Sequence, residues 1–160
     1  MSESASGALE TGGAPRIHPP ALAGLLLLGG LLLHLLGHHH RPVVHPHQLV
    51  GLLIIAGGVA LMVYAAALFA ARDTTKNPYG EATSFVLMTP FTFTRNPMYA
   101  GLAAMLLGFA AFFASFAILL AAIIFFFVID RMVIPQEEQR MERLFGQQYL
   151  DYKTRVRRWF

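Results

Sequence analysis

The 160-residue sequence contains no cysteine, and only 13% of its residues are charged. The absence of cysteine excludes disulfides, thiolate nucleophiles and Cys-ligated zinc, and it leaves no thiol from which a redox compartment could be inferred. The sequence also lacks a strand pattern followed by G-x-G-x-x-G, so no Rossmann-type nucleotide site is predicted. Any chemistry must therefore come from other side chains in another kind of fold.

Apolar residues take the place of the missing charge and make up 56% of the chain. This content exceeds what a soluble core of this size needs, so it predicts a membrane protein. The formal net charge is +3, but the basic residues flank apolar segments instead of forming a surface interleaved with aromatic residues. This pattern fits membrane lipids with anionic headgroups, and neither a nucleic acid nor an obligate protein partner is expected.

The apolar runs predict an all-α integral membrane bundle of four transmembrane helices. Residues 1–20 show no apolar period and predict a disordered tail, whereas residues 21–160 form a single domain. Residues 98–129 carry no charge, yet as one helix they would span ~48 Å against a hydrocarbon core of ~30 Å. A helical hairpin turning near residues 114–116 removes this mismatch. The predicted spans are about 21–36, 49–71, 98–114 and 116–134.

The distribution of basic residues predicts the orientation. In a four-span arrangement eleven of the twelve Lys and Arg residues share one side, and only Arg41 lies on the other. The positive-inside rule makes the crowded side cytoplasmic, so both termini are expected there, in a bacterial inner membrane. A cleaved signal peptide is the alternative for residues 21–36, but a cationic cluster and a small-x-small cleavage site are missing. The loop 72–97 and the tail 135–160 therefore face each other.

Two motifs are explained without a ligand. The histidine-rich stretch 38–47 contains Pro42 and Pro46, which break a helical register, and no carboxylate lies nearby, so no metal site is predicted. Small residues in the second and third spans predict close packing of helix backbones. These residues are Gly57 and Gly58 in the second span, and Ala100, Ala104 and Gly108 in the third.

The tail opens with Pro135, followed by Glu137 and Glu138, and acids suit the positive N-terminal end of a helix. Gly146 is predicted to end or bend this helix. Taken alone, the tail predicts a cytoplasmic, amphipathic interfacial helix with a capping acid pair, followed by aromatic and cationic residues that contact lipid headgroups. The alternative function is therefore a non-enzymatic membrane scaffold that binds anionic lipid.

Several short motifs follow one another in the second half of the chain. They are R-N-P-M-Y at 95–99, E-E at 137–138, F-G-x-x-Y-x-x-Y at 145–152 and R-V-R-R-W at 155–159, with a hydrophobic hairpin after the first. In this order, over residues 85–160, the sequence resembles the isoprenylcysteine carboxyl methyltransferase and phospholipid N-methyltransferase family.

The resemblance implies an integral-membrane enzyme that takes S-adenosylmethionine from the cytosol. Its acceptor would be lipophilic and would reach the site from the bilayer, presenting a carboxylate, an amine or a thiol. A membrane-embedded reductase of the related sterol type is a further alternative, but it would need nicotinamide and more spans than this short chain offers.

The resemblance also implies the residues that bind the cofactor. With F-G-x-x-Y held in register, Glu137 rather than Glu138 is expected to touch it. An arginine can clamp a carboxylate, a carboxylate can bind ribose hydroxyls or an amino group, and an aromatic ring can cover adenine. The implied cofactor-binding residues are Arg95, Asn96, Pro97, Met98, Tyr99, Glu137, Glu138, Leu87, Met88 and Phe91.

The sequence departs from the family pattern at positions that bear on catalysis and substrate. Asn96 stands where many members have histidine and cannot titrate near neutrality, so no catalytic base is predicted there. Methyl transfer would instead depend on positioning and exclusion of water. In the prenylcysteine enzymes an arginine before the acidic run holds the substrate carboxylate, but here Val133 takes that register. Arg131 is the nearby candidate for substrate binding, and a prenylated protein is not predicted.

Overall fold

The computed structural model describes residues 17–37, 46–73 and 89–160, and all regular structure within them is helical. The prediction of an all-α protein is confirmed. The predicted tail up to residue 16, the histidine-rich residues 38–45 and residues 74–88 of the predicted loop 72–97 lie outside the described residues. The elements are α1 (Pro19–Gly37), α2 (Pro46–Asp73), α3 (Pro97–Phe112), α4 (Phe116–Val128), the π-helical segment η1 (Ile129–Val133), α5 (Ile134–Phe145) and α6 (Gln147–Arg155).

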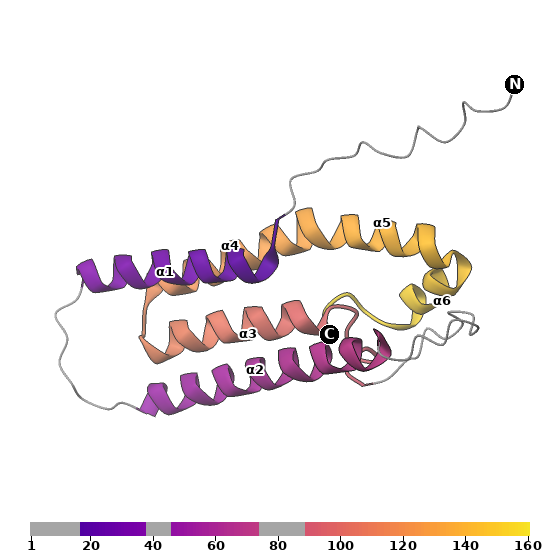
Figure 1. Cartoon of the computed structure of the whole chain (residues 1–160). Helices are drawn as coiled ribbons and strands as arrows, with labels where there is room; N and C mark the ends of the chain where they lie inside the picture. Colours follow the sequence, from indigo (N-terminus) through magenta and orange to yellow (C-terminus); the bar gives the residue numbers. More distant parts are fainter. Residues whose placement is uncertain (1–16, 38–45, 74–88) are drawn as a thin grey trace, which may run out of the picture.

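The long helices lie side by side in the order α1, α4, α3, α2 (Figure 1). Within the described residues three helices are long and apolar enough to cross a membrane, namely Pro19–Gly37, Pro46–Leu68 and Phe116–Phe145. The apolar helix α3 has 16 residues, about 24 Å at 1.5 Å per residue, which is shorter than a hydrocarbon core of about 30 Å. These helices indicate an integral membrane protein with three candidate spans, and the fourth crossing remains a prediction.

Glycines bring the backbones of α2 and α3 together. A Cβ atom at Gly58 would lie 2.6 Å from the carbonyl oxygen of Gly101, and one at Gly108 would lie 2.8 Å from that of Gly51. A side chain at any of these positions would push the helices apart, so the predicted close packing is confirmed at Gly58 and Gly108. It is wrong for Gly57, where a Cβ would meet no described atom within 4 Å. Adjacent helical residues point about 100° apart, so only one of the pair can face α3.

The turn between α3 and α4 covers residues 113–115, at the place where the length argument requires a break. The Oγ atom of Ser115 accepts a hydrogen bond from the backbone N–H of Ile118 at 3.4 Å and so caps α4. α3 begins at Pro97, where a missing N–H costs nothing because the first turn has no internal acceptor for it. The end of α4 and the start of α3 therefore lie at the same end of the bundle.

The acid pair of the tail meets no free helix end. Pro135 lies in the first turn of α5 as predicted, but α4, η1 and α5 run on as one helix over Phe116–Phe145. The backbone N–H groups at the start of α5 face the preceding π-helical turn, so Glu137 and Glu138 do not cap a helix start. The capping interpretation of the acid pair is therefore wrong.

The π-helical segment explains how a proline fits into this helix. The N–H of Ile134 bonds the carbonyl of Ile129, five residues earlier. In the same register the residue at position 135 would donate to the carbonyl of Asp130, but Pro135 has no N–H to donate. The Nη1 atom of Arg158 lies 3.4 Å from that carbonyl and donates to it instead. The C-terminal residues thus complete the hydrogen bonding of the helix that they pack against.

After α5 the chain reverses and returns to the start of α3 (Figure 1). Gly146 ends α5 with φ at 53°, a backbone conformation that favours glycine, and its N–H donates to the carbonyl of Glu142 at 2.9 Å. A small buried cluster then fixes α6 against α5. It contains Tyr149, Tyr152 and Val156, with Met141 and Phe145 packed against them.

Candidate functional site

The last residues of the chain pair with the segment that precedes α3. The backbone N–H of Arg95 donates to the carbonyl of Arg157 at 3.0 Å. The carbonyl of Arg158 accepts from Thr94 Oγ1 at 3.0 Å and from Asn96 Nδ2 at 3.1 Å. The R-N-P-M-Y and R-V-R-R-W motifs, more than 60 residues apart, therefore form one structural unit.

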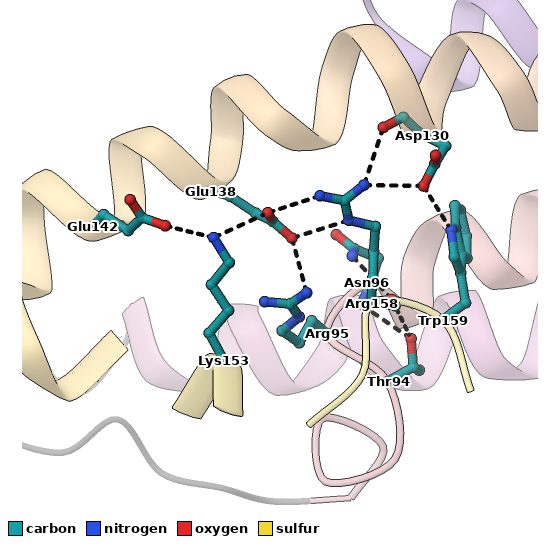
Figure 2. Close-up of polar contacts among 9 residues, drawn as sticks. All are labelled: Thr94, Arg95, Asn96, Asp130, Glu138, Glu142, Lys153, Arg158 and Trp159. Carbon is teal, nitrogen blue, oxygen red and sulfur yellow. Dashed lines mark hydrogen bonds and ion pairs between the residues drawn. The ribbon is translucent and has the colours of Figure 1, made fainter. Parts of the chain in front are cut away.

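Glu138 lies at the centre of an ion-pair network at this end of the bundle (Figure 2). Its side chain is only 8% exposed. Arg158 donates Nε to Oε1 at 3.2 Å and Nη2 to Oε2 at 3.0 Å. Arg95 Nη2 lies 3.2 Å from Oε1, and Lys153 Nζ lies 3.6 Å from Oε2. Each oxygen thus faces two cationic donors, which is the full capacity of a carboxylate.

Asp130 extends the network onto the π-helical segment. Its Oδ1 atom accepts from Arg158 Nη1 at 3.3 Å and from the indole Nε1 of Trp159 at 2.9 Å. The Trp159 ring packs on Phe126, with ring centroids 4.8 Å apart. The hydrogen bond to Glu138, together with the charges of both acids, raises the pKa of Arg158 above its ordinary value. Arg158 therefore stays charged across the physiological range.

Glu137, the neighbour of Glu138, has a different environment. Its side chain is exposed, and its Oε1 atom accepts a hydrogen bond of 2.6 Å from the hydroxyl of half-buried Tyr99. Because successive residues of a helix point about 100° apart, one acid faces the C-terminal tail and the other faces outward. The two acids thus join α5 to two successive positions of the R-N-P-M-Y motif, Glu138 to Arg95 and Glu137 to Tyr99.

Arg95 is buried but incompletely paired. Its side chain is 10% exposed, and only Nη2 contacts Glu138. The Nε and Nη1 atoms are buried and find no hydrogen-bond acceptor within residues 17–37, 46–73 and 89–160. Buried guanidinium donors without acceptors are costly, and anionic oxygen atoms are the acceptors that suit them best. This corner of the site can therefore receive an anionic group of a ligand.

Other residues implied by the resemblance lie around this corner. Pro97 is fully buried at the start of α3, and Met98 is half-buried beside it. Phe91 is half-buried, and its carbonyl accepts from the hydroxyl of Tyr152 at 2.8 Å. Burial raises the pKa of Tyr152 to about 12, so this hydroxyl remains a donor at neutral pH. Leu87 and Met88 lie outside the described residues.

Arg131, the candidate for substrate binding, lies on η1 and is exposed. Its side chain is 76% exposed, and its Nε atom lies 3.2 Å from Oδ2 of Asp130. Asp130 therefore orients Arg131 on one side while it binds Arg158 and Trp159 on the other.

Several residues of the network were not predicted as part of a site. The sequence interpretation assigned the aromatic and cationic residues after Gly146 to lipid headgroups, but Tyr152 is buried, and Arg158 and Trp159 bond the acids of the network. One signal was available, because Asp130 ends a long uncharged run. An acid at such a position needs a partner. The partner lies at the far end of the sequence, where no local pattern points to it.

Comparison with known proteins covers the R-N-P-M-Y and E-E motifs, and the family match ends before R-V-R-R-W. Residues 46–148, more than half of the chain, match the family described as phospholipid methyltransferase. An uncharacterized protein of Haemophilus influenzae is 39% identical over 62 residues, which are 39% of this chain and 98% of that protein. No solved structure matches. The chain belongs to the phospholipid methyltransferase family, and membership implies a methyltransferase that acts on a lipid-like substrate.

Proposed function

We propose that this protein is an S-adenosylmethionine-dependent methyltransferase whose acceptor is a lipophilic molecule embedded in the bilayer. The observation that carries the proposal is Arg95, a buried arginine with two nitrogen atoms that lack an acceptor among the described residues. This arginine lies at one end of an apolar helix bundle, where a water-soluble cofactor and a membrane-embedded acceptor can meet. The bias of basic residues supports a four-span arrangement with this end and both termini in the cytoplasm of a bacterial cell.

The residues at this end fit the polar groups of S-adenosylmethionine. Arg95 would hold the carboxylate with the donors that Glu138 leaves available. Glu137 would hold the amino group or the ribose hydroxyls, and Tyr99 keeps this carboxylate in place through the 2.6 Å hydrogen bond. When bound, the cofactor supplies an electrophilic methyl group on a sulfonium sulfur. The further residues proposed to line the cofactor are Asn96, Pro97, Met98, Phe91, Leu87 and Met88.

The different environments of the two acids support the choice of Glu137 as the cofactor ligand. Glu138 is buried and its oxygens already face four cationic donors. Glu137 is exposed, and its Oε2 atom has no donor among the described residues. Of these two acids, only Glu137 has an oxygen atom that no donor of the described residues occupies. Glu138 would act on the cofactor indirectly, through Arg95.

Arg131 is proposed to bind the anionic headgroup of the acceptor. Its exposed guanidinium lies where the apolar α4 passes into the polar end, and π-helical segments such as η1 often occur at functional sites. The reactive group of the acceptor would be a carboxylate, an amine or a thiol. We assign no general base, because the chain's contribution is to align the acceptor with the methyl group and to exclude water.

The test is calorimetric binding of S-adenosylmethionine and S-adenosylhomocysteine to detergent-purified protein. Wild type should bind saturably, and Arg95→Ala and Glu137→Ala should each weaken binding by about 10- to 100-fold, because each removes charge-assisted hydrogen bonds of about 1.5–3 kcal/mol. Arg143→Ala and Asp151→Ala are matched controls, since both side chains are exposed and carry the same charges. They should leave the affinity within about twofold.

A transfer assay then addresses the acceptor. Cofactor with a radiolabelled methyl group is incubated with the protein in vesicles that contain phosphatidylethanolamine or a lipid with a free carboxylate, and the label is counted in the organic extract. Label in the lipid fraction supports the proposal and names the acceptor group. If well-folded wild type binds neither cofactor form, the proposal fails and a lipid-binding scaffold takes its place.

A further inference from the structure

We propose that Arg158 is a positioning residue of the cofactor site. Its two hydrogen bonds to Glu138 keep two donors of Arg95 available for the cofactor carboxylate. Arg158 lies ten residues beyond the segment 46–148 that matches the family. The inference rests on the proposed function, since it takes the cofactor carboxylate as the ligand of Arg95.

Arg158 and Arg95 compete for the carboxylate of Glu138. Glu138 receives two nitrogens from Arg158, at 3.2 and 3.0 Å, but only Nη2 from Arg95, at 3.2 Å. Because both Glu138 oxygens are already shared, Arg95 cannot engage this acid with a second nitrogen without displacing Arg158. The donors of Arg95 that remain without an acceptor among the described residues are Nε and Nη1.

Removal of the Arg158 side chain would change the pairing of Glu138. Glu138 would lose its bidentate partner, and the nearest remaining arginine is Arg95. A paired, buried carboxylate is strongly favoured over an uncompensated one, so Arg95 would turn toward Glu138 with a second nitrogen. The cofactor carboxylate would then compete with Glu138 for the same donors. Affinity would fall although Arg158 itself touches no part of the cofactor.

Contacts with other residues hold Arg158 in the position from which it pairs with Glu138. Its carbonyl accepts from Thr94 and Asn96, its Nη1 atom donates to the carbonyl and to Oδ1 of Asp130, and the next residue, Trp159, bonds the same Oδ1. Figure 2 shows the Arg158 guanidinium between Glu138 and Asp130. Its position is therefore fixed from the backbone and from both acids.

Lys153 is a poorer candidate for the same role. Its Nζ atom lies 3.6 Å from Glu138 but 2.7 Å from Oε1 of Glu142, so Glu142 is its main partner. A lysine also presents a single nitrogen and cannot occupy both carboxylate oxygens with the fork of a guanidinium.

The experiment compares two nucleosides that differ in the amino-acid part. S-adenosylhomocysteine carries a carboxylate and an amino group on its homocysteine part, whereas 5′-methylthioadenosine has the same adenosine and thioether and lacks both groups. Arg158→Ala should weaken the binding of S-adenosylhomocysteine by about tenfold or more, as expected for a lost charged contact. It should change the affinity for 5′-methylthioadenosine by less than about twofold. Arg158→Lys should fall between wild type and Arg158→Ala, since it keeps the charge but not the fork.

Arg157→Ala is the matched control, because its side chain is exposed and it removes the same charge from the adjacent position. It should leave both nucleosides at wild-type affinity. An equal loss of both nucleosides in Arg158→Ala would mean a merely structural role and would overturn the inference.

A double-mutant cycle gives an independent decision that needs only S-adenosylhomocysteine. If Arg158 acts through Arg95, Arg158→Ala should cost nothing further in protein that already carries Arg95→Ala. Additive losses would overturn the inference. The two failures are distinguishable: if wild type binds no cofactor, the proposed function fails and this inference with it. If wild type binds but Arg158→Ala binds equally well, only the inference fails.

Discussion

The body of α3 and the segment at its start are held by opposite kinds of interaction. Along the body, Gly101 and Gly108 let the α2 backbone approach so closely that an added Cβ would meet it at 2.6–2.8 Å. At the start, Arg95 and Asn96 are held by charged and polar atoms from α5 and the C-terminal tail. The body of α3 should therefore lose stability when a side chain is enlarged, and the segment at its start should lose stability when a charged or polar side chain is truncated.

The physical reason lies in the surroundings of the two regions. In lipid there is little hydrophobic driving force for helices to associate, so close van der Waals contact between small residues supplies the attraction. At the polar end the ions are withdrawn from water, and each one is tolerable only while its partners remain. Figure 2 shows that a small group of side chains pairs these ions, with Glu138 linking three cations.

The largest effect is expected from deleting the central acid. Glu138→Ala would leave Arg95, Arg158 and Lys153 without their common partner, and breaking such a buried network costs about 3–5 kcal/mol. Thermal unfolding in detergent should show a large drop in midpoint. Glu137→Ala is the control, since this acid is exposed with one hydrogen bond, and it should cost less than about 1 kcal/mol while losing cofactor affinity. Equal destabilisation by both variants would contradict the division of roles between the acids.

An intermediate effect is expected from adding a methyl group to the α2 and α3 contact. Gly58→Ala would place a Cβ 2.6 Å from the Gly101 carbonyl oxygen, and such overpacking typically costs about 1–3 kcal/mol. Gly57→Ala, with open space around it, should be neutral or slightly stabilising because alanine favours a helix over glycine. Unfolding midpoints of the two variants decide the matter, and a destabilising Gly57→Ala paired with a harmless Gly58→Ala would reverse the assigned helix face.

The smallest effect is expected from a neutral hydrogen bond at the polar end. Tyr152→Phe removes the 2.8 Å bond to the Phe91 carbonyl and should cost about 1 kcal/mol at neutral pH. Burial raises the pKa of Tyr152 from 10.0 to about 12, so its stabilising contribution is present below pH 10 and is lost as the pH rises through about 12. The wild type should therefore lose stability more steeply than Tyr152→Phe between these values. Parallel unfolding curves for the two proteins would show that this hydroxyl is not protected by burial.

Much of the helical layout could be predicted because it depends on neighbouring residues. Proline positions and apolar runs predict the start of α3 next to Pro97 and a turn near residues 114–116, within one residue of the observed turn at 113–115. Gly146 ends α5 as expected. The continuity of α4 into α5 could not be predicted. A proline near a helix start usually marks a true start, and here the π-helical turn and Arg158 make an internal proline acceptable.

The candidate site was predictable only in its list of motifs. The order of R-N-P-M-Y, E-E and R-V-R-R-W indicates the family, but it does not say that Arg158 bonds Glu138 or that Asp130 receives Trp159. Those contacts join residues 20 and 29 positions apart through a chain reversal at Gly146. Periodicity within one helix carries no information about such a reversal.

The sequence by itself determined that this is a membrane protein, where most of its helices lie and to which family it belongs. Apolar content, proline and glycine positions and ordered motifs carry this information, because they are properties of short stretches of chain. Only the tertiary structure decided which of two adjacent residues packs against a neighbouring helix or is buried. Gly58 packs and Gly57 does not, and Glu138 is buried while Glu137 faces outward. In each pair the identities are the same and the positions differ by about 100° around a helix, so only the placement of the neighbouring elements separates them.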